Sequence, residues 1–333
     1  MPPQFSLDTV FVLTPHAHLV PSDVTLTVMT LDADYIFGKH KARIISVATP
    51  LLDGCHTLAD IAAQTGVPVE ELGTTLTPLT GDGHLTDITR LLHAGSAEEF
   101  LAGYFMLCDF WAKDIFGQPF WLSMLSGHSS RSQVLGWGIE FYHRTVGADE
   151  HNAKSVAHCR DPELRAWLRE HFEEECGHSE IFLDGLEACG FARDEVAASP
   201  PLPSSRALIE YMNGLAIDDS VAYLGCYGVL HSPRVGQTPE RLNSQFDLLV
   251  GHYPFATAIL DKIREHALLD LHLGHNRIVL ERVAKRDGGF PPATAARILR
   301  AARGVVRAFC NLFAGIHEYY GQPTAMLPRR RLV

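Results

Sequence analysis

Two segments of this chain concentrate the residue types that bind metal ions. In the first, Glu175 and His178 are three residues apart, and on a helix that spacing turns both side chains to one face, where they can share a metal ion. An isolated pair of this kind is more often a solvated acidic turn with a capping histidine. The second segment, Glu265–His275, changes that balance, because it places three histidines and two acidic residues within 11 residues of an otherwise apolar helical stretch. Packing hardly explains such a cluster, so we expect a metal site.

The second segment does not decide which of two histidines, His272 or His275, is a metal ligand. His266 and Asp270 are four residues apart and share a helical face. His275 follows His266 by nine residues, which places it on the opposite side of a regular helix, but a one-residue π-bulge near Gly274 would rotate it part of the way back. His272 is the alternative ligand and would need a different distortion.

The donor set indicates iron. Imidazole and carboxylate ligands with open positions suit Fe(II) that binds dioxygen, whereas thiolate-rich sites suit zinc or iron–sulfur clusters. Cys176 lies between Glu175 and His178 and should therefore point elsewhere. The seven cysteines are scattered, odd in number and form no Cys-x-x-Cys pair, which favours a reducing, cytoplasmic compartment over a disulfide framework.

A second Glu-x-x-His pair, Glu140 and His143, lies on the preceding predicted helix. These two residues either line the pocket and orient the ligands by hydrogen bonds, or form a salt link on the helix surface. His272 joins them as a pocket residue if His275 is the ligand. The segment Asp149–His151 is expected to be a solvated turn after this helix.

The elements that must position these residues are mostly helical. From Ala97 onward the sequence pattern predicts an all-α domain over residues 97–333, with no heptad repeat and no internal repeat. Proline near a helix start and glycine after a helix end support the individual bounds. The predicted helices span Ala97–Ile115, Ser132–Val146, Pro162–Glu187, Arg206–Leu215, Ser220–Leu230, Pro239–Phe246, Phe255–Val283 and Ala293–Tyr319.

The segments FEEECGHSEIFLDGLEACGF and REHALLDLHLGHNRIVLERV resemble the heme-oxygenase-like non-heme di-iron oxidases and oxygenases. The resemblance covers about residues 97–320. It implies a heme-oxygenase-like helical bundle and an iron enzyme with O2 as co-substrate. The metal ligands that it implies are Glu175, His178, His266, Asp270 and His275.

One position departs from that family. The family supplies a further glutamate from an intermediate helix, and here the corresponding position, 35 residues before His266, is His231. A histidine leaves two carboxylates and four histidines, hence fewer bridging oxygens than a carboxylate-rich di-iron site has. The resemblance therefore implies Fe(II), with two irons of uneven affinity as the first interpretation and a mononuclear site as the other.

The order of predicted strands and helices in residues 1–90 indicates a small α+β domain that resembles a winged helix. Thr57 is a helix N-cap with Asp60 three residues on, and Gly66 ends that helix. Pro68 begins the next helix, which ends near Gly81. Residues 88–96 follow as a linker. The other predicted elements are strands at Phe11–Leu13, Val24–Met29, Tyr35–Phe37 and Gly83–Thr86, and a helix at Ile44–Leu52.

The phrase LLDGCHTLADIAAQTGVPVEELGTTLTPLTGDGHL resembles the winged-helix peptide-recognition modules of ribosomal-peptide modification systems, over about residues 8–87. That resemblance implies a leader or carrier peptide that pairs with a sheet edge. A DNA-binding winged helix is the alternative. Residues 43–87 hold one basic residue, Arg43, against six acidic ones, which disfavours phosphate binding.

Composition limits the partners. The 333 residues suit two domains, and 28 basic against 39 acidic residues give a formal net charge of −11, unlike the basic footprint of a nucleic-acid binder. No apolar run approaches the roughly 20 residues that span a bilayer, and the N-terminus lacks a secretory pattern, so neither a membrane nor secretion is expected. The oligomeric state is open, and a homodimer is compatible with the sequence.

Together these features predict an iron-dependent, O2-using oxidoreductase that modifies a peptide or peptide-tethered substrate in natural-product biosynthesis. Tethering would raise the local concentration of a weak substrate at the catalytic site. Two rivals remain: a cofactorless oxidase similar to pyrroloquinoline quinone synthase, and a non-catalytic peptide-binding protein. The metal-ligand spacing counts against the first rival.

Overall fold

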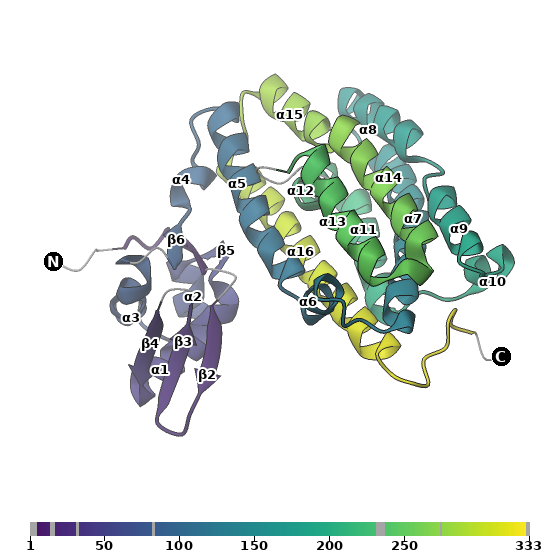
Figure 1. Cartoon of the computed structure of the whole chain (residues 1–333). Coiled ribbons are helices and arrows are strands. Elements are labelled where there is room, and N and C mark those ends of the chain that lie inside the picture. The colour runs from purple at the N-terminus through teal and green to yellow at the C-terminus, as the bar shows by residue number, and fades with distance from the viewer. Residues whose placement is uncertain are drawn as a thin grey trace. The chain divides into compact units, whose positions relative to one another are not determined.

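The computed structural model describes residues 5–13, 17–30, 33–81, 84–230, 237–273 and 275–330 (Figure 1). Its contacts divide the chain into two compact units, which are described separately. The first unit contains Met1–Lys113 and Ala284–Arg303, and the second contains Asp114–Val283 and Gly304–Val333. The division therefore assigns most of the helix that starts at Ala97, and a late segment of the chain, to the first unit.

The first unit holds two small antiparallel sheets. One has the strand order β5-β1-β6, formed by β1 (Val10–Leu13), β5 (Asp53–Thr57) and β6 (Leu85–Asp87). The other is a meander in the order β2-β3-β4, formed by β2 (His18–Pro21), β3 (Thr25–Met29) and β4 (Asp34–Gly38). The predicted strands are present, apart from Gly83, which lies outside the described residues. Strands β2 and β5 were not predicted, because neither shows apolar alternation.

The first unit also contains helices, of which α1, α2 and α3 pack against the strands. The helices are α1 (Lys39–Ala48), α2 (Leu58–Thr65), α3 (Val69–Gly81), α4 (Thr89–Leu92) and α5 (Ala97–Phe116), with a 3-10 turn η1 (Thr49–Leu51). The capping prediction for α2 is confirmed: Thr57 and Asp60 form a reciprocal capping box, and Gly66 ends the helix at φ 69°. A buried core that includes Phe11, Val28 and Leu58 joins sheet and helices. Its winged-helix identity stays a prediction.

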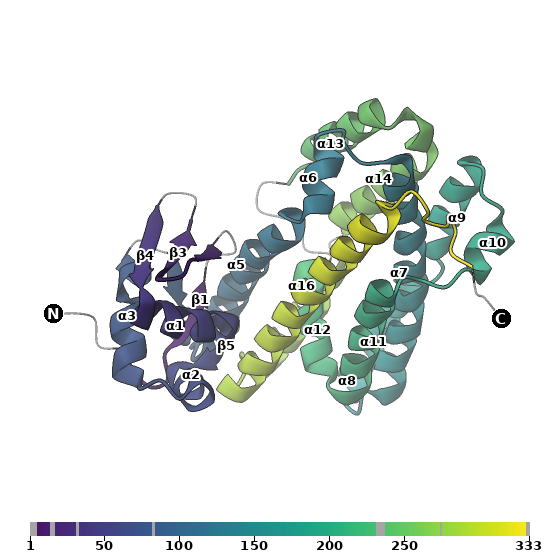
Figure 2. The same ribbon diagram turned by 90° about the horizontal axis from the view of Figure 1, so that it is seen from below.

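The described residues of the second unit are helical, as predicted (Figure 2). No described helix is long and apolar enough to cross a membrane. A 3-10 turn, η2 (Pro254–Ala256), precedes α14. The α-helices from here to the C-terminus are α6 (Pro119–Leu125), α7 (Arg131–His158), α8 (Pro162–Glu175), α9 (Ser179–Ala188), α10 (Arg193–Ala198), α11 (Pro203–Asp218), α12 (Ser220–Leu230), α13 (Pro239–His252), α14 (Thr257–Leu273), α15 (His275–Asp287) and α16 (Pro292–Tyr320).

Helix α7 is the central helix of this unit and contacts α8, α9, α11, α12 and α14. It begins at a Ser130–Gln133 capping box and continues well past the predicted end at Val146. The expectation of a solvated turn at Asp149–His151 was therefore wrong. His151 and Asn152 are buried, because α8, α11 and α12 pack around the second half of α7 and turn its polar face inward.

The predicted helix Pro162–Glu187 is two helices. Helix α8 ends at Glu175, Gly177 adopts φ +88°, and α9 begins after His178. A left-handed residue cannot continue an α-helix, and glycine adopts that conformation at little cost. Glu175 and His178 are therefore brought together by a turn rather than by a shared helical face.

Candidate metal centre

Three of the predicted ligands converge in the second unit. One ligand atom from each of Glu175, His178 and His266 lies within 4.8 Å of the other two. Glu175 is the last residue of α8, His178 is the residue that precedes α9, and His266 comes from the middle of α14. Glu175 and His266 are buried, with relative exposures of 6% and 3%, and His178 is partly buried. Segments almost 90 residues apart in sequence thus form one polar cluster.

The turn at Gly177 fixes the first half of the cluster. His178 Nδ1 lies 3.4 Å from Glu175 Oε2. The imidazole rings of His178 and His266 are 5.2 Å apart, with an interplanar angle of 89°. The close contact with Glu175 raises the pKa of His178, and the negative charges of Glu175, Asp270 and Asp149 raise it further, against the effect of burial. Several anions therefore favour a positive charge at this place.

His266 has two differently placed nitrogens. Its Nδ1 lies 3.3 Å from Asp270 Oδ2, one helical turn further along α14. Its Nε2 is buried and has no hydrogen-bond partner among the described residues. A carboxylate beside one imidazole nitrogen orients the ring so that the other can bind a metal ion. Asp270, predicted as a ligand, thus lies where it positions His266.

These residues fit a ferrous ion. Two imidazoles and a carboxylate are a donor set that iron accepts, and no thiolate competes among them. A buried polar atom without a partner costs about 1–3 kcal/mol, and a metal ion would remove that cost at His266 Nε2. Cys176, at the C-cap of α8, is exposed and lies outside the converging group.

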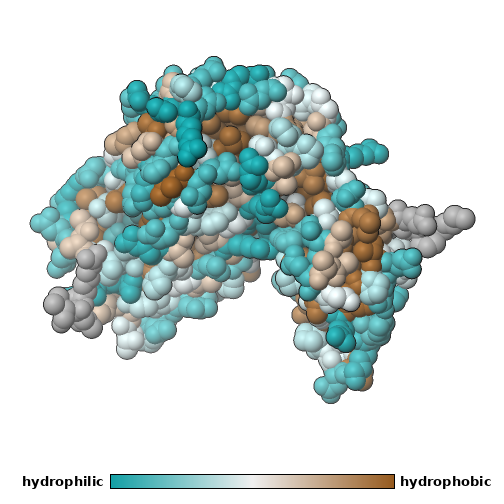
Figure 3. Space-filling view, turned by 180° about the vertical axis from the view of Figure 1, so that it is seen from behind, coloured by the Kyte–Doolittle hydropathy of each residue, from teal (hydrophilic) through white to brown (hydrophobic). Residues whose placement is uncertain are grey.

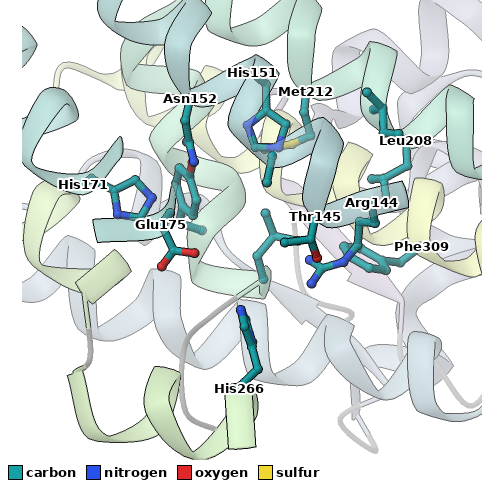
Figure 4. Close-up of a pocket in the computed structure, with 14 residues that line it drawn as sticks. Arg144, Thr145, His151, Asn152, His171, Glu175, Leu208, Met212, His266 and Phe309 are labelled. Carbon is teal, nitrogen blue, oxygen red and sulfur yellow. The ribbon is translucent and has the colours of Figure 1, made fainter. Parts of the chain in front are cut away.

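Glu175 and His266 line a pocket in the second unit (Figure 4). Helix α7 supplies one wall, and α8, α11, α12, α14 and α16 supply the rest. The wall mixes polar side chains near the carboxylate with aliphatic and aromatic ones further away. The lining residues are Arg144, Thr145, Ala148, His151, Asn152, His171, Glu175, Leu208, Ile209, Met212, Tyr227, Leu230, His266 and Phe309.

A buried hydrogen-bond network supports the α7–α12 wall. Tyr223 and Tyr227 both donate to Asn152 Oδ1 at 2.6 Å, and their hydroxyls lie 2.6 Å apart. His151 Nδ1 is 2.6 Å from the Tyr223 hydroxyl. Burial raises the pKa of both tyrosines, so they stay protonated. The ring of His171 meets Tyr227 edge-on at 5.0 Å, which links the network to α8.

The sequence did not single out several residues of this site. His171 precedes Glu175 by one helical turn, so its spacing could have identified it. Asp149 of α7 is near enough to Gly177 and His178 for both to lower its pKa, but burial raises the pKa more. Only the tertiary structure reveals the part that Asp149 and the pocket residues of α7 play in this site. Asp149, His151 and Asn152 lie beyond the predicted end of the helix, and Arg144 and Thr145 form no recognisable motif.

The pair Glu140 and His143 lies away from the pocket. Glu140 Oε2 accepts hydrogen bonds from Leu202 N at 3.0 Å and from Ser205 Oγ at 2.5 Å. Its Oε1 accepts from the Tyr320 hydroxyl at 2.8 Å. His143 Nε2 is 3.0 Å from Ser199 Oγ. This pair therefore ties α7 to the start of α11 and the end of α16 instead of orienting metal ligands.

Among the described residues, the cluster contains Glu175, His178 and His266, and the structure does not place His231, His272 or His275 in it. His272 is exposed near the end of α14. His231 and Gly274 lie outside the described residues. His275 is the first residue of α15, and its side chain is likewise not described. The ligands of a second iron stay a prediction.

A family model for iron-containing redox enzymes matches residues 135–309, which is more than half of the chain. The chain belongs to this family. It is 28% identical over 149 residues to a pyrroloquinoline-quinone synthase of Pseudomonas aeruginosa, a match that covers 42% of this chain and 57% of that enzyme. Both converging segments fall within the residues that the family model matches.

The fold is also shared with a solved structure. A domain of unknown function with a heme oxygenase-like fold from Shewanella denitrificans aligns with a TM-score of 0.53 and 17% identity. The alignment covers 71% of this chain and 97% of that chain. The predicted heme-oxygenase-like fold is thereby confirmed.

Proposed function

We propose that this protein is a non-heme iron enzyme that uses dioxygen to oxidise a peptide or peptide-tethered substrate. The observation that carries the proposal is the buried convergence of Glu175, His178 and His266, with His266 Nε2 lacking a hydrogen-bond partner among the described residues. Membership of a family of iron-containing redox enzymes supports the choice of metal.

In this proposal the chain divides the work among a few residues. Glu175, His178 and His266 hold the iron, and Asp270 fixes the orientation of the His266 ring through Nδ1. Bound Fe(II) supplies a binding position and electrons for dioxygen. The apolar wall of the pocket excludes water from the reacting centre, because aliphatic and aromatic side chains offer water no hydrogen bonds.

A second iron is part of the proposal, with His231 and His275 among its predicted ligands. Glu175 and Asp270 together carry two negative charges, which balance one ferrous ion better than two in a buried site. We therefore expect one tightly held iron at Glu175, His178 and His266, and a second held more loosely.

The first unit would capture a leader or carrier peptide. The strand order β2-β3-β4 leaves β2 and β4 as edges, and strand edges pair readily with extended peptides. Val20, Met29 and Ile36 of this sheet are 46%, 42% and 70% exposed. The face shown in Figure 3 carries hydrophobic patches between hydrophilic areas. Such a module would deliver the attached substrate by raising its effective concentration.

The proposal is tested by measuring iron and turnover in the same sample. Purified protein is loaded anaerobically with Fe(II), its iron content is measured by elemental analysis and Mössbauer spectroscopy, and O2 consumption follows with candidate peptides. Bound iron with peptide-dependent O2 uptake is the expected result. Protein that holds no iron after loading would contradict the metal assignment.

A metal-free oxidase is the second candidate, because the chain is similar to a pyrroloquinoline-quinone synthase. The two functions make opposite predictions for a chelated sample. O2-dependent turnover that persists after complete removal of iron would support the metal-free oxidase. Iron binding without turnover on any peptide would instead favour a metal-dependent binding protein.

A further inference from the structure

Arg144 on α7 is a cation without a partner in the pocket. Its Nε is buried, and among the described residues Arg144 has neither a hydrogen bond nor an ion pair within 4.0 Å. The guanidinium lies over the ring of Phe141 at 4.3 Å, which holds the group in place from one side. Figure 4 shows the side chain extending into the pocket beside Thr145.

The neighbouring anions do not satisfy this cation. Glu175 and Asp270 are close enough to raise the pKa of Arg144, but burial lowers it more. Glu175 Oε2 contacts His178, and Asp270 Oδ2 contacts His266. An arginine remains charged in proteins and presents a planar fork of donors that matches a carboxylate in two parallel hydrogen bonds. Arg144 thus offers such a fork to whatever enters the pocket.

The other side of the pocket selects an apolar group. Leu208, Ile209 and Met212 of α11 and Phe309 of α16 line it with aliphatic and aromatic surface. Thr145 adds no free donor, because its hydroxyl donates to the Phe141 carbonyl at 3.0 Å. Among the described residues that line the pocket, Arg144 is therefore the one guanidinium group, and it lies opposite apolar side chains.

We propose that Arg144 binds the carboxylate of the substrate, and that the group entering the pocket is a carboxylate on a compact apolar body, such as the C-terminal residue of a peptide. The inference rests on the proposed function, which makes this pocket the substrate site. Glu175 and Asp270 are each in contact with a histidine of the cluster, so the carboxylate of a substrate is the anion left to pair with Arg144. A phosphate dianion would bring a larger negative charge close to these two carboxylates and Asp149.

The test compares an acid with its neutral amide. N-acetyl-leucine and N-acetyl-leucinamide are titrated calorimetrically into full-length, Fe(II)-loaded protein under anaerobic conditions. We expect the acid to bind at least about 10-fold more tightly than the amide, since a hydrogen-bonded charge pair is worth that factor or more. Arg144→Gln should abolish this preference, and Arg144→Lys should retain part of it. Arg169→Gln, an exposed arginine of α8, is the charge-matched control and should keep the wild-type ratio.

Each arm has a result that overturns the inference. Equal binding of acid and amide by the wild type contradicts it without any variant, and so does an unchanged ratio in folded Arg144→Gln or Arg144→Lys. Methyl phosphate that binds more tightly than the acid would replace the carboxylate assignment. 4-Methylpentanoate in place of N-acetyl-leucine separates a free acid from a peptide terminus. Iron content is measured in the same samples. Wild-type protein that holds no iron contradicts the proposed function. In that case the ratio of acid to amide affinity, measured on the metal-free protein, still tests whether Arg144 binds a carboxylate.

Discussion

Two Glu-x-x-His pairs with identical spacing have different surroundings in this protein. Glu140 accepts hydrogen bonds from Leu202, Ser205 and Tyr320, and His143 contacts Ser199. Glu175 and His178 instead lie within reach of His266, whose Nε2 has no hydrogen-bond partner among the described residues. Spacing puts an acid and an imidazole together in both pairs. The residues that face them decide whether the pair holds helices together or is available to a metal ion.

The difference also appears in the directions of the histidine pKa values. Burial, together with the nearby positive charges of Arg206 and Arg329, lowers the pKa of His143 to about 4. At His178 the contact with Glu175 and the surrounding carboxylates raise the pKa. A positive charge is therefore disfavoured at His143 and favoured at His178, in line with the structural contacts of the first pair and the metal-binding role that we propose for the second.

The largest expected effect is the loss of iron when His178 or His266 of the proposed metal centre is replaced. His178→Ala and His266→Ala should each weaken iron binding by at least about 10–100-fold, because even residues that only orient a ligand are worth that much. Helical circular dichroism should stay near wild type. His143→Ala is the matched control and should keep its iron. Full iron content in either ligand variant would show that the comparison is wrong.

Removing the acid of the first pair should reduce stability rather than metal content. Glu140→Ala leaves the donors of Leu202, Ser205 and Tyr320 without their acceptor. We expect the free energy of unfolding in urea to fall by about 3–5 kcal/mol, because each unsatisfied buried group costs about 1–3 kcal/mol. Tyr320→Phe removes one of these bonds and should cost about 1 kcal/mol. A loss of iron per folded molecule would place Glu140 in the metal site after all.

The pH dependence of stability should report on His143. Its pKa is about 4 in the folded protein and about 6.5 when unfolded, so the unfolded state binds the proton between these values. Stability should therefore be full above pH 6.5 and fall by about 2–3 kcal/mol as the pH drops to 4. Urea titrations at several pH values measure the fall, and His143→Asn should flatten this part of the curve. An equal slope in both proteins would assign the effect to other groups.

The smallest expected effect concerns Asp149, which lies within electrostatic reach of His178. Asp149→Asn removes one negative charge near the second pair without removing a ligand. Iron affinity should fall by only a few-fold, since the Asp149 charge does not coordinate the iron and its effect on the metal is partly screened. Glu150→Gln, at the exposed neighbouring position, is the control and should leave the affinity unchanged. A loss as large as that of His266→Ala would make Asp149 a ligand.

Local signals predicted much of the fold. The Thr57–Asp60 capping box, Gly66 and Pro162 gave correct bounds because capping and proline geometry depend on a few adjacent residues. The strands β2 and β5 escaped prediction since their residues carry no alternating pattern. The second half of α7 was missed because its polar residues read as a surface turn, although α8, α11 and α12 bury them.

The sequence by itself determined the chemistry that this protein can hold: the family segments, the acid and imidazole side chains, and the spacing of His266 and Asp270 along one helix. It did not decide how Glu175 reaches His178, because the break at Gly177 replaces the expected helical face with a turn. Nor did it distinguish the two Glu-x-x-His pairs. That choice rests on contacts with α11, α14 and α16, which lie far away in sequence, and hydrogen bonding and burial there depend on tertiary packing rather than on local spacing.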